Sequence, residues 1–99
     1  MPSLALAAGD LALVRQILAR HVAGTPVVAF GSRVTGEART WSDLDLMLLT
    51  QSPPPAPALA DLREEFMVSD LPISVDVIDA SRADPAFVEA ALRGALPIA

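Results

Sequence analysis

The fold is decided by the stretch VVAFGS at residues 27–32, which is followed after ten residues by DLDLMLL at residues 43–49. Both segments contain short apolar runs typical of buried strands, and the glycine and serine indicate a tight turn. Side chains two residues apart on a strand lie on the same face of a sheet. Asp43 and Asp45 are therefore expected on one face, and the leucines that alternate with them on the other.

The two aspartates at the start of the second strand are the first candidate functional residues. Two carboxylates side by side on an apolar strand lower stability unless a cation or hydrogen-bond donors satisfy them. Carboxylates together with phosphate oxygens are the usual surroundings of Mg²⁺. The alternative for a bare Asp-x-Asp is structural, with a turn at Ser42-Asp43 and a solvated Asp45 where the strand begins.

The glycine and serine before the loop favour the functional interpretation. Gly31 permits a sharp turn or a close approach of the backbone to a ligand. Ser32 is a good N-cap for a short helix at residues 33–35, whose free N–H groups would bind an anion. A phosphate-binding turn beside a metal-binding carboxylate pair indicates phosphoryl or nucleotidyl transfer.

Composition excludes several other classes of protein. The 99 residues predict a single domain at residues 1–99, and 53% hydrophobic with 19% charged residues predict a folded chain. A net charge of −5 argues against direct binding of nucleic acid. No apolar run approaches the ~20 residues of a membrane helix, and no signal peptide is expected. The absence of cysteine is compatible with the cytoplasm, which is the expected location.

The middle of the chain predicts two helices and a third strand. Helical spacing of apolar residues predicts a helix at residues 11–22, with Asp10 as its N-cap, and another at residues 58–67. Residues 73–78 are expected to form the third strand. The segment 51–57 is too dense in proline for regular structure and is expected to be a surface connection.

The end of the chain predicts one more helix and an apolar tail at residues 96–98. The helix is expected to start at Ser81 or Asp84, with Pro85 in its first turn, and to bury Phe87, Val88, Ala91 and Leu92. The order of elements predicts an α/β fold, with a small mixed sheet and helices packed on one side. Too few residues join the first two strands for a crossover helix, so antiparallel pairing is expected.

A resemblance to a known family rests on these residues. Gly31-Ser32-Arg33, Gly36 and Ser42-Asp43-Leu44-Asp45-Leu46 resemble the signature of minimal nucleotidyltransferases in the DNA polymerase β superfamily. The segment LPISVDVID at residues 71–79 is similar to the later strand of that family, which carries a third carboxylate. The resemblance covers nearly the whole chain and implies a polymerase β-like fold. Val34-Thr35 departs from the pattern, which commonly has alanine and a basic or polar residue.

The resemblance implies roles for seven residues. It makes Asp43, Asp45 and Asp76 catalytic residues and Mg²⁺ ligands, and it places ATP against Gly31, Ser32, Arg33 and Ser42. Asp76 alternates with Val75 and Val77, so its side chain is expected to point away from theirs. Asp79 breaks this alternation and is interpreted as a strand-end cap, with a catalytic role held in reserve.

Several residues near the motif have two interpretations. Arg33 either steadies the phosphates or braces the loop by pairing with an aspartate. Trp41 either packs on the loop, which is the simpler role, or stacks on a base. Ser42 most simply hydrogen-bonds locally to shape the turn. Arg39 is interpreted as a loop charge within reach of a nucleotide.

The resemblance also implies an activity and a partner. It indicates an Mg²⁺-dependent transfer of AMP from ATP onto a hydroxyl, namely a tyrosine of a HEPN-domain toxin that the chain neutralises as antitoxin. The alternatives are a module that silences the toxin by binding alone, or an orphan domain that acts on a small molecule. Candidate contacts with the partner are the apolar arm at residues 4–6, the tail at residues 96–98 and a surface at Phe66 and Met67.

Overall fold

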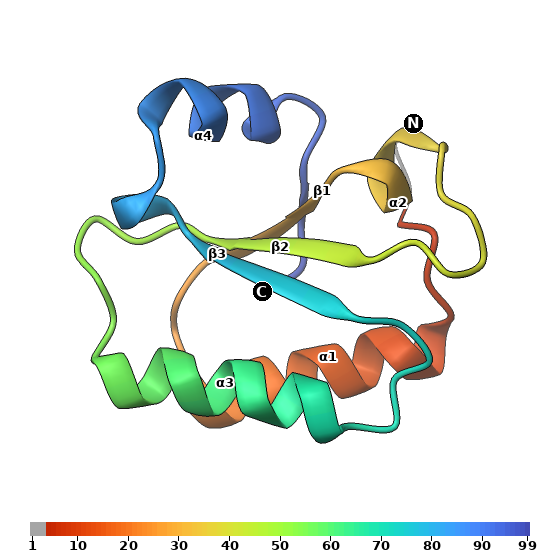
Figure 1. The fold of residues 1–99 in the computed structure, drawn as a ribbon, viewed down its shortest axis with the longest axis horizontal. Helices are drawn as coiled ribbons and strands as arrows, with labels where there is room; N and C mark the ends of the chain where they lie inside the picture. Colours follow the sequence, from red (N-terminus) through yellow and green to blue (C-terminus); the bar gives the residue numbers. More distant parts are fainter. Residues whose placement is uncertain (1–3) are drawn as a thin grey trace.

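The computed structural model describes residues 4–99 as a four-stranded sheet between helices. Figure 1 shows the long helices below the sheet and shorter helices above it. In chain order the elements are α1 (Ala8–His21), β1 (Val27–Phe30), α2 (Ser32–Thr35), β2 (Leu44–Leu48), α3 (Ala56–Val68), β3 (Val75–Asp79), η1 (Ala80–Arg82), α4 (Pro85–Leu92) and β4 (Leu96–Pro97). None of the helices in the described part of the chain is both long and apolar enough to cross a membrane.

The sheet is mixed, as predicted, with the strand order β3-β2-β1-β4. β1 pairs antiparallel with β2, which confirms the expected pairing, and antiparallel with β4. β2 pairs parallel with β3, so the chain crosses over through α3 between these two strands. The α/β class and the small mixed sheet are thus confirmed.

The core lies between the sheet and the pair of long helices α1 and α3. Ala29, Leu46 and Val77 are partners in neighbouring strands, so they share one face, and all three are buried. Ile17 from α1 and Leu62 from α3 are buried in the same cluster. Because this apolar face is fully covered, the opposite face is where polar side chains can reach solvent.

Two helices begin earlier than predicted. α1 begins at Ala8, with Ala7 at the N-cap position, so Asp10 lies in the first turn and is not the cap. Alanine favours helix, and an acidic residue in the first turn suits the helix dipole, so the helix extends past Asp10. α3 begins at Ala56, with proline inside its first turn, where a missing N–H costs little. The expectation that residues 51–57 lack regular structure is therefore wrong at its last two residues.

The last helix begins as predicted but is not buried as predicted. The Asp84 side chain accepts a hydrogen bond from the N–H of Ala86, 2.8 Å away, and Pro85 follows it. No residue of α4 is buried, and Phe87 and Leu92 are 45% and 41% exposed. The reason is that α4 lies over the face of the sheet opposite α1 and α3 (Figure 1). The expectation that the helices pack on one side of the sheet is therefore wrong.

The predicted strand and tail boundaries also change. β3 covers Val75–Asp79, so it starts two residues later than expected and includes Asp79. The segment expected to be an apolar tail forms β4, and the buried Ile98 belongs to the core. The tail is therefore sheet and core in this structure, which removes most of it as a free contact surface. Phe66 is likewise buried, whereas Met67 is 81% exposed.

Candidate active site

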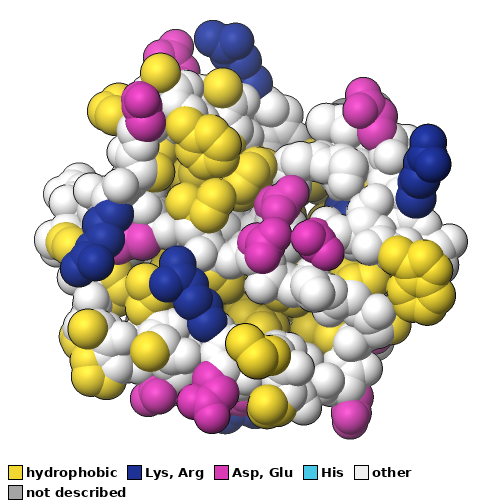
Figure 2. All heavy atoms as spheres, viewed as in Figure 1, with side chains coloured by type: hydrophobic (Ala, Val, Ile, Leu, Met, Phe, Trp, Pro, Cys, Tyr) yellow, Lys and Arg dark blue, Asp and Glu magenta, His cyan; other side chains and the backbone are white. Residues whose placement is uncertain are grey.

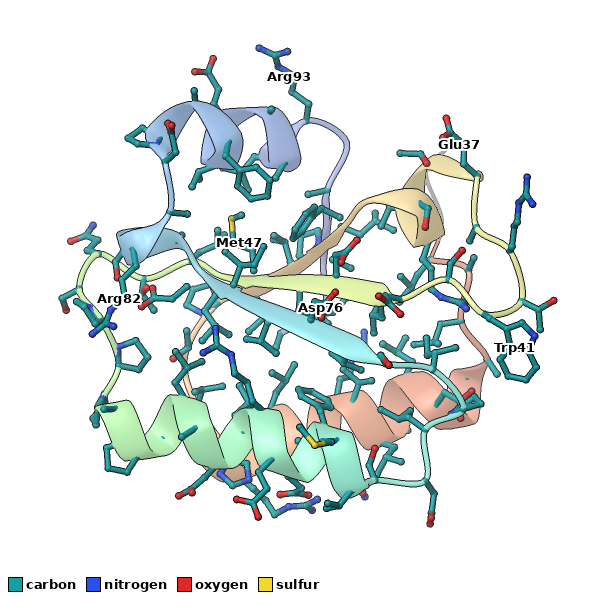
Figure 3. The ribbon with its side chains drawn as sticks, in the orientation of Figure 1. Glu37, Trp41, Met47, Asp76, Arg82 and Arg93 are labelled. Atoms are coloured by element: carbon teal, nitrogen blue, oxygen red, sulfur yellow. The ribbon has the colours of Figure 1, made fainter. Side chains whose placement is uncertain are left out.

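The carboxylates that the motif predicted lie on the face of the sheet toward α4. Asp45 on β2 is the direct partner of Asp76 on β3 and of Phe30 on β1. Direct partners in neighbouring strands point to the same side of the sheet, and such strands lie about 4.8 Å apart. Figure 2 shows acidic side chains gathered in the middle of this face, and Figure 3 labels Asp76 there. The strand pairing thus brings two predicted catalytic residues together.

Gly31 gives the Asp45 carboxylate the room it occupies. Gly31 has φ +82°, in the region that favours glycine, and a Cβ atom at this position would overlap with Asp45 Oδ2. The turn therefore requires glycine for two reasons, its backbone conformation and its contact with the carboxylate. This contact places the Gly31-Ser32 turn directly against the acidic pair.

The carboxylates influence one another electrostatically. Burial raises the pKa of Asp45 above its ordinary value, and the nearby charges of Asp76 and then Asp43 raise it further. Asp43 lies two residues before Asp45 and is exposed. A bound cation would relieve this repulsion, and oxygen donors of this kind are those that Mg²⁺ prefers. Within residues 4–99, however, no three acidic, histidine or cysteine side chains already lie close enough to form a metal-ligand set.

The short helix α2 starts directly after Gly31. The predicted short helix is present, but its N-cap is Gly31 and not Ser32 as predicted. Ser32 is the first residue of the helix. The N–H groups of Val34 and Thr35 donate to the carbonyl oxygen of Gly31, at 3.0 and 3.1 Å. The N–H groups of Ser32 and Arg33 have no acceptor within the helix, because they precede its first complete turn.

Arg33 braces the loop that leads from α2 to β2. Its guanidinium is buried and donates to the carbonyl oxygens of Ser42 (2.9 Å), Thr40 (3.1 Å), Arg39 (3.4 Å) and Ala5 (2.6 Å). The bracing alternative is thus what the structure shows, although the partners are carbonyl oxygens and not an aspartate. Because these contacts occupy both Nη atoms and Nε, the geometry gives no support to the nucleotide contact predicted for Arg33.

The arm at residues 4–6 is held by both the side chain and the backbone of Arg33. The N–H of Ala5 donates to the carbonyl oxygen of Arg33 at 2.7 Å, and Leu4 and Leu6 pack against the core. Arg33 therefore ties the beginning of the described chain to the loop that carries Asp43. The arm is an internal contact here, which argues against its expected role as a free surface for a partner.

Ser42 shapes the loop between α2 and β2, whereas Trp41 and Arg39 in the same loop are exposed. Ser42 Oγ accepts a hydrogen bond from the N–H of Arg39 at 2.8 Å, which confirms the local role expected for Ser42. Trp41 is 77% exposed, so the simpler expectation that it packs on the loop is wrong. Figure 3 shows Trp41 at the outer end of the loop, well away from Asp76 in this view. Arg39 is exposed, as expected for a loop charge.

Asp79 is a strand-end cap, as predicted, and lies apart from the acidic face. Its Oδ1 accepts hydrogen bonds from Thr50 Oγ1 (2.5 Å), the N–H of Ser81 (3.0 Å) and Ser81 Oγ (2.8 Å). Burial alone would raise the pKa of Asp79, but these hydrogen bonds outweigh it and lower the pKa. Its buried carboxylate therefore has a structural role. The structure gives no support to the alternative that Asp79 is a catalytic residue.

An apolar wall beside the carboxylates was not predictable from the sequence. An open cavity of about 1020 Å³ follows the β3 side of the sheet, and Asp45, Asp76, Phe30, Ile78 and Phe87 are among the residues that line it. The rings of Phe30 and Phe87 meet edge to face, with centroids 6.0 Å apart and planes at 83°. Phe87 comes from α4, and no local pattern predicts that this helix returns to the face of the aspartates.

Comparison with known proteins agrees with this geometry. Residues 13–98 match the family described as "Polymerase beta, Nucleotidyltransferase". The match spans most of the chain, so the chain belongs to this nucleotidyltransferase family. The resemblance carried by residues 31–46 and 71–79 is thereby confirmed.

One curated relative and two solved structures are similar to this chain. The chain is 46% identical over 70 residues to the probable protein adenylyltransferase MntA of Haemophilus influenzae, which covers 71% of this chain and 61% of that protein. A crystal structure of a toxin-antitoxin with AMP-PNP matches 90% of this chain and 72% of that one, with TM-score 0.74 and 19% identity. A mutant of the toxin-antitoxin MntA-HpeT matches 90% and 71%, with TM-score 0.65 and 13% identity. These structures show that the fold is shared.

Proposed function

We propose that this chain is an Mg²⁺-dependent protein adenylyltransferase that moves AMP from ATP onto a tyrosine hydroxyl of a HEPN-domain toxin. The observation that carries this proposal is the pairing of Asp45 with Asp76 against the Gly31 turn. Within residues 4–99, no protein hydrogen bond to either carboxylate offsets the repulsion between Asp45 and Asp76. A divalent cation with a phosphate ligand would offset it.

The reaction assigns roles to the three carboxylates. Asp43 and Asp45 would hold Mg²⁺, which supplies charge neutralisation at the phosphates of ATP. Asp76 would accept the proton of the attacking hydroxyl or complete the metal site. The hydroxyl oxygen forms a bond to the α-phosphorus, the bond from that phosphorus to the bridging oxygen breaks, and pyrophosphate leaves with the electron pair.

The turn before α2 would bind the phosphates. The N–H groups of Ser32 and Arg33 have no acceptor within the helix, and the Ser32 hydroxyl lies beside them. Gly31 allows the backbone to approach a phosphate as closely as it approaches Asp45. Ser42 would contribute to nucleotide binding indirectly, by shaping the loop that carries Asp43.

The comparisons support a protein partner as the acceptor. The similar relative is described as a probable protein adenylyltransferase, and both similar structures are toxin-antitoxin structures, one of them with AMP-PNP. The match spans 61% of the length of that relative, so the acceptor, the HEPN identity of the toxin and the cytoplasmic location belong to the proposal. The net charge of −5 favours a protein acceptor over a nucleic acid.

A second candidate function is neutralisation by binding alone. It is favoured by one observation, namely that within residues 4–99 the acidic side chains do not already form a complete metal-ligand set. In that case the chain would hold the toxin without adding AMP to it.

The two functions differ in the mass of the partner. The purified chain is mixed with its HEPN partner, ATP and Mg²⁺, and the partner is weighed by intact-protein mass spectrometry. We expect the addition of one or more AMP units, and no addition with Asp43→Asn/Asp45→Asn. Asp61→Asn, an exposed acid on α3, is the matched control and should retain transfer. An unchanged mass together with a stable complex would overturn the enzymatic proposal in favour of binding alone.

A further inference from the structure

The face of the sheet that carries the carboxylates also carries the apolar wall, formed by the half-buried Phe30 and Ile78 and the exposed Phe87. Phe30 is the direct strand partner of Asp45, and Ile78 follows Asp76 on the same face of β3. Phe87 reaches this face from α4 and meets Phe30 edge to face. Figure 2 shows hydrophobic side chains between α4 and the acidic side chains. Acidic and aromatic groups therefore line one cavity.

The exposure of this wall needs an explanation. Complete burial of a phenylalanine side chain contributes about 1.5–3 kcal/mol, yet Phe87 remains 45% exposed. α4 has no buried residue of its own, although Val28 and Met47 are buried on this face of the sheet, and Met47 lies between the sheet and α4 in Figure 3. The Phe87 ring therefore covers the sheet only in part and stays open to the cavity. A ring held in this way is suited to contact with another apolar group that enters the cavity.

The proposed reaction determines what can enter on this side. In phosphoryl transfer the attacking and leaving oxygens lie roughly in line on opposite sides of the phosphorus. The leaving pyrophosphate would lie at the Gly31-Ser32 turn, next to α2. The attacking hydroxyl must then approach from the other side of the carboxylates. In Figure 3, α4 lies above Asp76 to the left and α2 above it to the right, so the acceptor side is the side of α4.

We infer that Phe30, Ile78 and Phe87 form the acceptor subsite and bind the aromatic ring of a tyrosine, with its hydroxyl toward Asp76. This inference rests on the proposed adenylyltransferase function. A tyrosine has an apolar ring and a polar hydroxyl. These two parts match the apolar wall and the carboxylate of Asp76 at its end. Its phenolic oxygen bonds to the α-phosphorus, its proton passes to Asp76, and pyrophosphate leaves. A serine or threonine would reach the carboxylate but leave the wall uncovered.

Kinetics with peptide acceptors tests the inference. Short peptides that carry one tyrosine or one serine are incubated with the chain, ATP and Mg²⁺, and AMP addition is followed by mass spectrometry. We expect Phe87→Ala to raise the KM for the tyrosine peptide about tenfold and to leave the KM for ATP unchanged. Phe87→Leu should restore part of the loss, and Leu92→Ala, an equally exposed residue of α4, should have no effect.

Binding provides a readout that does not require turnover. N-acetyl-tyrosinamide or N-acetyl-serinamide is titrated by NMR into the chain with Mg²⁺ and AMP-PNP, and the shifts of the phenylalanine ring signals are followed. We expect tyrosinamide, and not serinamide, to shift Phe30 and Phe87, with at least fivefold weaker binding in Phe87→Ala.

The outcomes separate the subsite from the function. Transfer to tyrosine with an unchanged acceptor KM in Phe87→Ala would overturn the subsite and leave the proposed function intact. A raised KM for ATP would overturn it too, because the wall would then hold the nucleotide base. Specific binding of tyrosinamide without transfer to the HEPN partner or to either peptide would instead overturn the proposed function.

Discussion

At the scale of single residues, the contact between Gly31 and Asp45 organises the site. The backbone at Gly31 has a positive φ, and its missing side chain leaves space for a carboxylate oxygen. The sequence predicted a sharp turn here because glycine before serine follows a buried strand. It could not predict the contact with Asp45, because this contact depends on the antiparallel pairing of β1 and β2.

We predict that Gly31→Ala costs more stability than a glycine substitution with similar backbone geometry. Gly24 has φ +80°, and no atom lies within 4 Å of the place that an alanine Cβ would take, so Gly24→Ala bears only the conformational cost, about 1 kcal/mol. Gly31→Ala adds the collision with Asp45 and should cost about 2–3 kcal/mol in total. Urea denaturation measures both, and equal losses would show that the Asp45 contact is unimportant.

We predict that Asp45→Asn abolishes AMP transfer and stabilises the fold at neutral pH. Because the folded state raises the pKa of Asp45, folding is favoured when this group is protonated. The contribution of Asp45 to the free energy of unfolding is therefore greatest below its ordinary pKa of 3.8. This contribution falls as the pH rises through the raised pKa of Asp45 in the folded protein. Partial solvation limits the gain in Asp45→Asn to about 0.5–1 kcal/mol. Urea denaturation at pH 7 checks the sign, and a loss of stability would contradict the repulsion inferred here.

At the scale of elements, Arg33 fixes the loop between α2 and β2. Its four carbonyl contacts join the loop, the arm at residues 4–6 and the first turn of α2. The sequence indicated either a phosphate ligand or a brace, and it could not decide, because backbone carbonyl partners leave no trace in the sequence. The brace keeps Ser42 and hence Asp43 in place.

We predict that Arg33→Lys loosens this loop. A lysine ammonium cannot reproduce the planar guanidinium contacts, so partly buried carbonyl groups lose their donors, at a cost of about 1–3 kcal/mol. Trypsin should then cleave faster after Arg39, which lies in the exposed loop. Arg93→Lys, on an exposed side chain beyond α4, is the control and should leave the cleavage rate unchanged. A loop that resists trypsin equally in Arg33→Lys would exclude the bracing role.

The contact between α1 and α3 gives a pH dependence of its own. Glu65 on α3 forms ion pairs with Arg20 and His21 at the end of α1, and hydrogen bonds from these two residues lower the pKa of Glu65 from 4.5 to about 2. A lowered pKa stabilises the fold above the ordinary value, and this contribution is lost as the pH falls from 4.5 through about 2. The wild type should therefore exceed Glu65→Gln in stability at pH 7 and match it near pH 2. Urea curves at both pH values test this, and a difference independent of pH would rule out the ion pairs as its cause.

At the scale of the whole molecule, local sequence patterns predicted the helices and strands better than they predicted which elements pack against each other. The strands with the motif and the helices α1, α3 and α4 followed from apolar spacing, proline and glycine. β4 was missed because Leu96-Pro97 is too short to show alternation and becomes a strand only by pairing with β1. The burial of Phe87 and Leu92 was wrongly predicted, because helical spacing shows which residues share a face but not what covers that face. The apolar wall of Phe30 and Phe87 was missed for the same reason.

Paramagnetic broadening by Mn²⁺ tests most directly whether the three carboxylates share a divalent ion. Mn²⁺ replaces Mg²⁺ in NMR samples of the chain with AMP-PNP, and the backbone signals are compared with and without it. We predict the strongest broadening at Asp43, Asp45, Asp76 and the Gly31-Ser32 turn, and its loss in Asp45→Asn. Broadening centred elsewhere, or unchanged in Asp45→Asn, would contradict a metal site between β2 and β3.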